Sequence, residues 1–148
     1  MNKLKNFQSE IFVPITPPPV WTPVTKELKN MKIAFATAAG VHLKNDKRFN
    51  LAGDFSFRTI PGDTNTDDLM VSHGGYDTGD INKDINCMFP LDRLRELKEE
   101  GFIKDIAPVH IGFMGGGGNQ EKFKNETGPA IAKILKDEGV DAVILTAG

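Results

Sequence analysis

Cysteine is almost absent from this sequence of 148 residues. Its single cysteine, Cys87, excludes an internal disulfide. No apolar run approaches the roughly 18 residues needed to span a bilayer, and the amino-terminal residues lack the apolar core of a secretory signal. We therefore expect a soluble cytoplasmic protein without a membrane span, whose stability comes from a packed hydrophobic core.

The sequence also lacks an excess of charge of either sign. Its 18 basic and 20 acidic residues leave a net charge of −2, which excludes a general basic surface for nucleic acid. Hydrophobic residues at 39% and charged residues at 26% are typical of a globular domain. The length is that of one domain, so one folded domain is expected.

Prolines cluster near the amino terminus, and residues 1–30 differ from the rest of the chain. The stretch VPITPPPVWTP holds five of the nine prolines. Because proline fixes φ and removes a backbone donor, residues 1–30 predict an extended, polyproline-like arm. Its apolar residues would be exposed to water unless another surface covers them, so we expect the arm to lie across the folded domain or across a partner. Residues 31–148 are then the α/β domain.

Short apolar runs alternate with helical segments from Met31 onward. The runs that predict strands end in glycine or in a turn signal; they are MKIAFATAAG, DFSFRTIPGD, DLMVSHGGYD, DIAPVHIGFMGGGGN and VDAVILTAG. PLDRLRELKEEGF predicts a helix. A further helix is predicted through Gln120–Asn125; Gly128-Pro129 interrupts it, and PAIAKILKDEG predicts a separate helix that ends at Gly139. This alternation is typical of an α/β fold with a Rossmann-like, mostly parallel sheet and flanking helices.

Four consecutive glycines, Gly115, Gly116, Gly117 and Gly118, lie between a predicted strand and a predicted helix. Unshielded backbone N–H groups beside a helix N-terminus can hold a carboxylate or a phosphate. No Gly-Lys-Ser/Thr follows and GxGxxG does not fit, so this is not one of the familiar nucleotide loops. Two interpretations remain open: an anion-binding loop, or a surface turn.

The three histidines His42, His73 and His110 fall at or near the ends of predicted strands. Ligands of open parallel sheets bind outside the carboxyl ends of the strands, so we expect the histidines to face one crevice, with Thr146 of the last strand as a further candidate. His73 ranks first for proton transfer, because its flanking glycines let a substrate approach closely. The carboxylates for a metal trio cannot be placed, so no metal is expected.

Cys87 has apolar neighbours on one side, in the sequence Asn86-Cys87-Met88-Phe89. Free cysteine is among the most buried residue types. A buried structural thiol is therefore favoured over a redox thiol.

Several segments together resemble one known family; they are GDFSFRTIP, LMVSHGGYDTGDINKDINCMFPLDRLRELKEEGFI, IAPVHIGFMGGGG and DEGVDAVILTAG. They resemble the selenoprotein B family, the selenoprotein subunits of the anaerobic reductases for glycine, sarcosine, betaine and D-proline. The opening EIFVPITPPPVWTPVTKEL, with AAGVHLKNDKRFN, is most similar to the D-proline reductase branch. The resemblance covers Glu10 to Gly148.

The resemblance implies a subunit of an oxidoreductase that opens the ring of D-proline to 5-aminovalerate, in amino-acid fermentation of the Stickland type. It implies a selenolate that attacks the α-carbon, a pyruvoyl group on a partner subunit that engages the substrate, and a thiol or dithiol that reduces the selenium centre. The complex would be a hetero-oligomer. An imidazole near neutral pH, such as that of His73, would give the opening ring nitrogen its proton.

In that family the selenocysteine lies just past the strand that matches VDAVILTAG, so it is expected just beyond Gly148. We expect a UGA codon there, a domain without its C-terminal part, an inactive chain and a last strand with an unpaired edge. Two alternatives remain open. One is the corresponding component of glycine, sarcosine or betaine reductase, and the other is a non-catalytic α/β module that binds a small anion.

Overall fold

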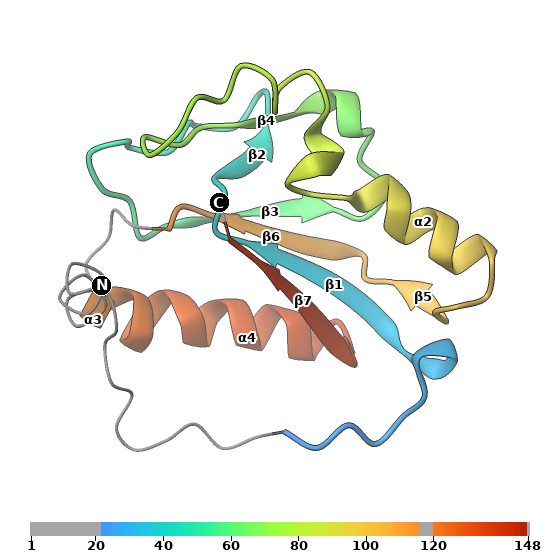
Figure 1. Cartoon of the computed structure of the whole chain (residues 1–148). Helices are drawn as coiled ribbons and strands as arrows, with labels where there is room; N and C mark the ends of the chain where they lie inside the picture. The colour runs from blue at the N-terminus through green and yellow to red at the C-terminus, as the bar shows by residue number, and fades with distance from the viewer. Residues whose placement is uncertain (1–21, 116–119, 148) are drawn as a thin grey trace, which may run out of the picture.

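A computed structural model describes residues 22–115 and 120–147 of the chain. The fold is α/β, with one main sheet, one small sheet and helices on both sides (Figure 1). In chain order the elements are η1 Leu28–Asn30, β1 Lys32–Thr37, β2 Val41–Leu43, β3 Phe57–Pro61, η2 Thr66–Asp68, β4 Leu69–Val71, η3 Ile85–Cys87, α2 Leu91–Glu99, β5 Asp105–Ile106, β6 Val109–Phe113, α3 Gln120–Lys122, η4 Phe123–Thr127, α4 Gly128–Asp137 and β7 Ala142–Thr146.

Strand β1 is the centre of the main sheet. β5 and β6 pair in parallel along one edge of β1, and β7 pairs in parallel along the other edge. β3 runs antiparallel to β6 and makes the sheet mixed. The α/β class is therefore confirmed, and the parallel core of the sheet is as expected; the Rossmann-like arrangement stays a prediction.

Two of the predicted strands differ from a parallel-sheet arrangement. β4 joins β2 in a separate antiparallel pair instead of the main sheet, and β3 enters the main sheet antiparallel. A parallel neighbour requires a long crossover, usually a helix. No helix lies between β1 and β4 other than the short turn η2, so the chain reaches both strands without such a crossover.

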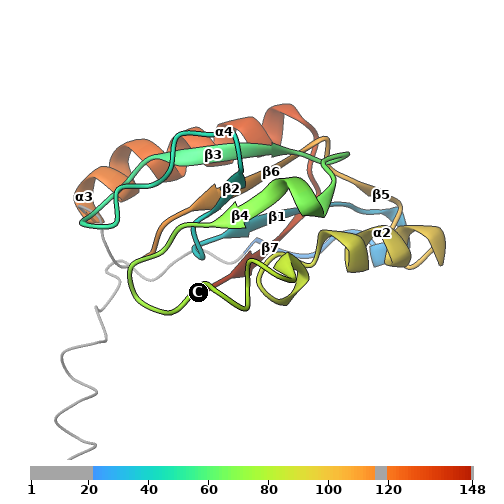
Figure 2. The same cartoon turned by 90° about the horizontal axis from the view of Figure 1, so that it is seen from above.

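The alternation of side chains along β1 divides the core into two layers. Ile33 and Phe35 face α2 and η3, while Ala34 and Ala36 face α4. Figures 1 and 2 show α4 on one side of the sheet, and α2 with the small β2–β4 sheet on the other. The layer under α2 contains buried residues from several parts of the chain: Ile60, Val71, Phe89, Leu91 and Leu94.

The predicted break at Gly128-Pro129 is wrong, because helical structure continues from Gln120 to Asp137. A π-helical turn, η4, lies directly before Gly128, and Pro129 occupies the first turn of α4. Proline has no backbone N–H to donate to the preceding turn, and it follows the π-helical turn, where the regular α-helical hydrogen-bond pattern is already interrupted. The wide turn joins two helical segments that the sequence pattern separates.

The predicted arm, residues 1–30, falls mostly outside the described residues. Of the part that is described, residues 22–27 carry no regular element and Leu28–Asn30 form η1. All of residues 22–30 are exposed, and Lys26 forms an ion pair with Asp141 beside β7. The polyproline conformation stays a prediction.

Strand β7 pairs with β1 over its whole length, and its other edge has no partner strand within the described ranges. Val143, Ile144 and Leu145 are 37%, 41% and 76% exposed. Val143 and Leu145 line a groove of about 810 Å³ that α4 and residues 22–28 share. Among the described residues, the edge of β7 away from β1 is therefore open.

No helix in residues 22–115 and 120–147 is long and apolar enough to cross a membrane.

Gly112 allows β2 to cross closely over β6. A Cβ atom at this position would lie 1.8 Å from the carbonyl oxygen of Val41. The obstacle is backbone, so it cannot move without displacing β2. Glycine at this position is therefore a requirement of the contact between the two sheets.

We predict that Gly112→Ala lowers the free energy of unfolding by more than about 3 kcal/mol, because overpacking against backbone cannot relax. Gly101→Ala is the matched control, because Gly101 has a φ of 74° and a Cβ added there would meet no atom within 4 Å. This substitution should therefore cost only the backbone strain of a positive φ, about 1 kcal/mol. Urea denaturation measures the free energy of unfolding of both variants, provided that the m-value does not change. Equal losses in the two variants would contradict the close approach.

Candidate functional site

The carboxyl ends of β1, β6 and β7 meet at one edge of the main sheet. Ala38, the first residue after β1, connects the other two strands. Its N–H donates to the carbonyl oxygen of Thr146 at 2.9 Å, and its carbonyl accepts from the N–H of Gly115 at 2.8 Å. The hydroxyl of Thr146 lies 3.4 Å from the carbonyl oxygen of Met88, a long contact. Thr146 and Gly115, which the sequence nominated separately, are therefore at the same edge.

His73 lies at this edge through its contact with Tyr76. The two rings are stacked, with centroids 4.5 Å apart and an interplanar angle of 17°. The hydroxyl of Tyr76 donates to the carbonyl oxygen of Ala39 at 3.0 Å. Burial, with the nearby Cys87 as a second cause, raises the pKa of Tyr76, so its hydroxyl is a protonated donor at neutral pH. The half-buried His73 is thus held beside the end of β1.

Tyr76 is a residue that the sequence reasoning did not select. It is the only tyrosine of the chain and follows His73 by three residues, in His-Gly-Gly-Tyr. This proximity was the available signal. The anchor to Ala39, 37 residues away, was not readable from the sequence.

His42 is fully buried in β2 and makes no contact with solvent. Its Nδ1 lies 2.6 Å from the carbonyl oxygen of Leu43 and must donate to it, so Nε2 accepts from the hydroxyl of Ser72 at 2.8 Å. Burial lowers the pKa of His42, which keeps the ring neutral. Both ring nitrogens are engaged by the protein, and His42 supports the segment that leads into His73.

His110 is fully buried in β6, and its ring packs against those of Phe35 and Phe89. Its Nδ1 accepts from the N–H of Phe35 at 2.9 Å, and its Nε2 has no hydrogen-bond partner among the described residues. Burial, followed by the charge of Arg95, lowers the pKa of His110 to about 4. The expectation that all three histidines face one crevice is therefore not met, because only His73 is accessible.

Gly115 is the one member of the glycine loop that the structure describes; Gly116, Gly117 and Gly118 lie outside the described residues. The anion-binding interpretation of the loop stays a prediction. What the structure adds is the position of the start of the loop, beside Ala38 and the end of β7.

Cys87 is exposed, so the expectation of a buried thiol is wrong. It is the last residue of η3, and the neighbouring apolar positions Ile85 and Phe89 take the buried places. The thiol of Cys87 lies 3.0 Å from the carbonyl oxygen of Asp84, which accepts its hydrogen bond. The local turn thus directs the cysteine outward even though its sequence neighbours are apolar.

Comparison with known proteins agrees with the resemblance read from the motifs. The model of the glycine/sarcosine/betaine reductase selenoprotein B family matches residues 1–148. The chain belongs to this family. It is 74% identical to the D-proline reductase subunit gamma of Acetoanaerobium sticklandii, over 98% of this chain and 60% of that protein.

Two further relatives belong to the reductases for glycine and sarcosine. The chain is 36% identical to the glycine reductase complex component B subunit gamma of Carboxydothermus hydrogenoformans, over 98% of this chain and 34% of that protein. It is 33% identical to the sarcosine reductase complex component B subunit beta of Peptoclostridium acidaminophilum, over 99% of this chain and 35% of that protein. The chain therefore spans only part of each relative. It matches no solved structure.

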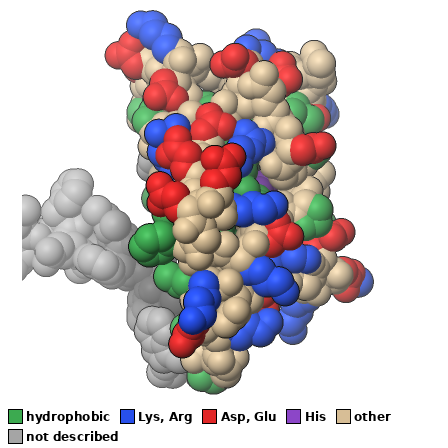
Figure 3. Space-filling model, turned by 90° about the vertical axis from the view of Figure 1, so that its right-hand side faces the viewer, with side chains coloured by type: hydrophobic (Ala, Val, Ile, Leu, Met, Phe, Trp, Pro, Cys, Tyr) green, Lys and Arg blue, Asp and Glu red, His purple; other side chains and the backbone are tan. Residues whose placement is uncertain are grey.

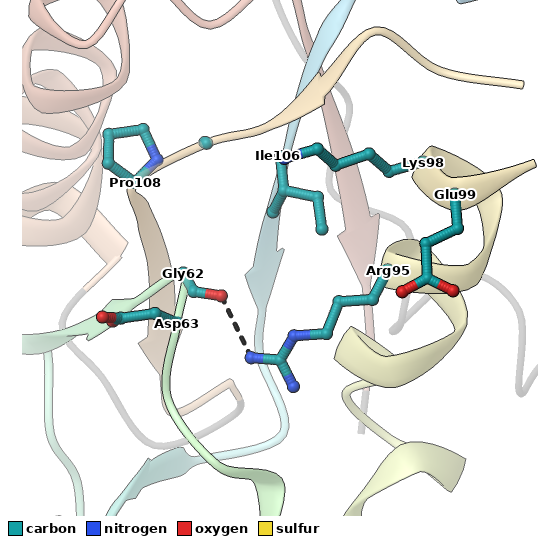
Figure 4. Close-up of a pocket in the computed structure, with 8 residues that line it drawn as sticks. Gly62, Asp63, Arg95, Lys98, Glu99, Ile106 and Pro108 are labelled. Carbon is teal, nitrogen blue, oxygen red and sulfur yellow. Dashed lines mark hydrogen bonds between the residues drawn. The ribbon is translucent and has the colours of Figure 1, made fainter. Parts of the chain in front are cut away.

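A cavity of about 570 Å³ lies at the opposite end of β6 in this selenoprotein B family member, next to Ala107 and Pro108 (Figure 4). Arg95 of α2 enters it and donates to the carbonyl oxygens of Gly62 at 3.1 Å and Thr64 at 2.6 Å. The guanidinium also pairs with Asp92 at 2.7 Å. Arg95 thus links the turn after β3 to α2. These bonds to the protein account for the position of its side chain.

Acidic and basic side chains are interspersed on the face that Figure 3 shows. Exposed ion pairs among the described residues include Arg93 with Glu96 and Lys98 with Asp105. Exposed pairs of this kind contribute little to stability. That face carries no extended field of one sign, in agreement with the near balance of charges in the sequence.

We predict that the fold of this family member loses stability through His110 as the pH falls from 6.5 toward 4. Because burial lowers the pKa of His110 to about 4, the unfolded chain binds a proton in this interval that the folded chain does not. The free energy of unfolding should fall by roughly 3 kcal/mol over the interval.

His110→Asn keeps a hydrogen-bond acceptor but cannot titrate, so it should lack this part of the pH dependence. Urea denaturation at a series of pH values from 7 to 4.5 measures the difference between the two proteins. His42, whose pKa burial also lowers, contributes equally to both and cancels. Parallel stability curves over this range would refute the assignment of His110 as a neutral core residue.

Proposed function

We propose that this chain is part of the gamma subunit of a D-proline reductase, which takes part in the reductive ring opening of D-proline to 5-aminovalerate. The observation that carries the proposal is the 74% identity to a D-proline reductase subunit gamma over nearly the whole chain. The relatives from glycine and sarcosine reductases are about half as similar, at 36% and 33%. The protein would work in the cytoplasm within a hetero-oligomeric complex, without nucleic acid.

In this proposal the full-length subunit contains a selenocysteine and meets a partner subunit with a pyruvoyl group. These groups supply a nucleophile for the α-carbon and an electron-withdrawing attachment for the amino acid, and a thiol or dithiol supplies two electrons. The edge formed by β1, β6 and β7 fits such chemistry, because it combines the accessible His73 with the half-buried Thr146. Ligands of open parallel sheets bind at this end of the strands.

His73 is the proposed proton donor. When the C–N bond of the ring opens, the nitrogen must gain a proton to become the amine of the product. Imidazole is the side chain best suited to donate a proton near neutral pH. Of the histidines, His42 and His110 are buried and engaged within the core, so His73 alone is available to a substrate.

Thr146 and the start of the glycine loop are the proposed contacts for the substrate carboxylate. The hydroxyl of Thr146 makes only a long contact to Met88, so it is available to a better acceptor. Gly115 lies at the same edge, where its own N–H is bonded to Ala38, and the glycines that follow it, Gly116, Gly117 and Gly118, would add backbone N–H groups.

The substrate assignment is tested with the complex assembled from the full-length subunit and its pyruvoyl-containing partner. With a dithiol as reductant, D-proline should be converted to 5-aminovalerate, while glycine, sarcosine and betaine should not be reduced at a comparable rate. Product analysis by chromatography measures all four reactions. Preferential reduction of one of the other three substrates would place the protein in another branch of the family.

The role of His73 is tested by His73→Gln in the same complex. Loss of a general acid should lower kcat about 100-fold or more, with a smaller effect on KM. Asp80→Asn is the matched control, because Asp80 lies on the same loop but is exposed, and its carboxylate pairs with the exposed Lys83. Its kcat should stay within about twofold of the unaltered complex. An unchanged kcat in His73→Gln would remove this histidine from the mechanism.

A further inference from the structure

We propose that Val20 and Trp21, at the end of the proline-rich stretch, pack into the groove between α4 and β7 and cover the exposed face of β7. Both residues lie just outside the described range, which begins at Thr22. The inference concerns the groove of about 810 Å³ that α4, β7 and residues 22–28 share. It goes beyond the proposed function and does not depend on it.

The walls of the groove are apolar and only partly covered. α4 contributes Ile131 and Leu135, and β7 contributes Val143 and Leu145. Leu145 is 76% exposed, and Val24, which lines the groove from the segment before η1, is 82% exposed. Apolar side chains gathered in this way on the surface of a folded protein mark a contact site.

The charged groups of the groove leave little attraction for a charged occupant. Lys26 and Asp141 both line the groove and form an ion pair with each other; Lys136 is the remaining charged lining residue. Asp141 also accepts a hydrogen bond from the backbone N–H of Lys32, at the start of β1, at 2.9 Å. The ion pair therefore ties the segment before η1 to the main sheet, alongside an apolar groove (Figure 1).

The stretch that precedes Thr22 has the composition that such a groove requires. No residue between Glu10 and Lys26 is charged. Thr22 itself lines the groove, and consecutive Cα atoms are about 3.8 Å apart, so the chain places Trp21 at the groove. A covalently attached occupant has an effective concentration that a separate partner does not reach.

The indole of Trp21 is the side chain that would supply most of the contact. A tryptophan side chain can bury about 150–250 Å². Pro17, Pro18 and Pro19 limit the conformations that the preceding stretch has before docking, which reduces the entropy lost when it docks. Docking would protect β7, the strand that carries Thr146 to the carboxyl edge of the sheet.

The fluorescence of Trp21 in the full-length subunit tests the proposal. Trp21 is the only tryptophan of this chain, and subtracting the emission of a matching Trp21→Phe variant removes the signal of any other tryptophan in the subunit. A docked indole should emit at a shorter wavelength than tryptophan in water and should be poorly quenched by acrylamide. Leu145→Asp should shift the emission toward that in water and raise quenching several-fold, because a carboxylate in the groove opposes burial of the indole.

Two further variants make this measurement specific. Ala132→Glu places a carboxylate in the groove from the exposed side of α4 and should have the same effect as Leu145→Asp, so misfolding of one variant does not decide the test. Phe102→Asp is the matched control, because Phe102 is 62% exposed and does not line the groove. It should leave the Trp21 signal unchanged.

Hydrogen exchange of β7 provides a second readout that does not use fluorescence. Trp21→Ala should increase the exchange rate of the β7 amides about 10-fold or more, because loss of a buried aromatic side chain makes local opening of the strand easier. Unchanged exchange in this variant would overturn the claim that Trp21 covers β7.

The other possible occupants of the groove give different results. A Trp21 signal like that of tryptophan in water overturns the proposal, as does a shielded signal that neither groove variant changes. A signal shielded only in the assembled complex assigns the groove to the partner subunit, and one that depends on protein concentration assigns it to a second copy; both overturn the proposal. Shielding at all concentrations, lost in both groove variants and kept in Phe102→Asp, is the expected result.

Discussion

The structure depends on the pairing of β1 along both of its edges. Ile33 pairs with Ile106 on one side and with Ala142 on the other, and Ala36 pairs in the same way with Ile111 and Leu145. Every residue of β1 after Lys32 is buried, so neither its direction nor its length can change without opening the core. The residues that directly follow β1 are held in place by this fixed strand. Ala38 and Ala39 hold the ends of β7 and β6 and the hydroxyl of Tyr76, so the candidate site is built on backbone groups of the least movable strand.

Burial gives the three histidines different properties although their side chains are the same. His42 and His110 lie where desolvation disfavours a charged ring, and both stay neutral and bonded within the core. The Nε2 atom of His110 is buried without a hydrogen-bond partner among the described residues. Its desolvation costs free energy that a phenylalanine at this position would not, and the hydrogen bond from the Phe35 N–H to Nδ1 offsets part of that cost. His73 alone combines partial exposure with fixed geometry. A proton donor needs both, because the proton must reach a substrate and the ring must be oriented when it does.

The sequence predicted the elements whose evidence is local. The apolar run at Met31 gave β1, and the leucine spacing with a closing glycine gave α2 close to its observed bounds. Two predictions failed for different reasons. The direction of β3 is set by its pairing with β6, about 50 residues later, which the local pattern does not show. Cys87 is turned outward because its near neighbours Ile85 and Phe89 take the buried positions of the short turn η3, a choice that apolar composition alone does not reveal. For the site, residue types and strand ends were sufficient to find His73 and Thr146. The anchor from Tyr76 to Ala39 required the folded chain.

The two ends of the main sheet use polar groups differently, and this difference favours the carboxyl edge for chemistry. At the amino end of β6, Arg95 is bound to two carbonyl oxygens and to Asp92, so a permanent charge is neutralised and fixed by the protein itself. At the carboxyl edge the backbone groups of Ala38 are satisfied by β7 and by Gly115, and the hydroxyls of Thr146 and Tyr76 lie near them. A fixed cation stabilises charge, whereas the proposed ring opening needs a proton delivered to one atom. A protonated imidazole would supply that proton, and His73 is the histidine that is both accessible and held by a neighbouring ring.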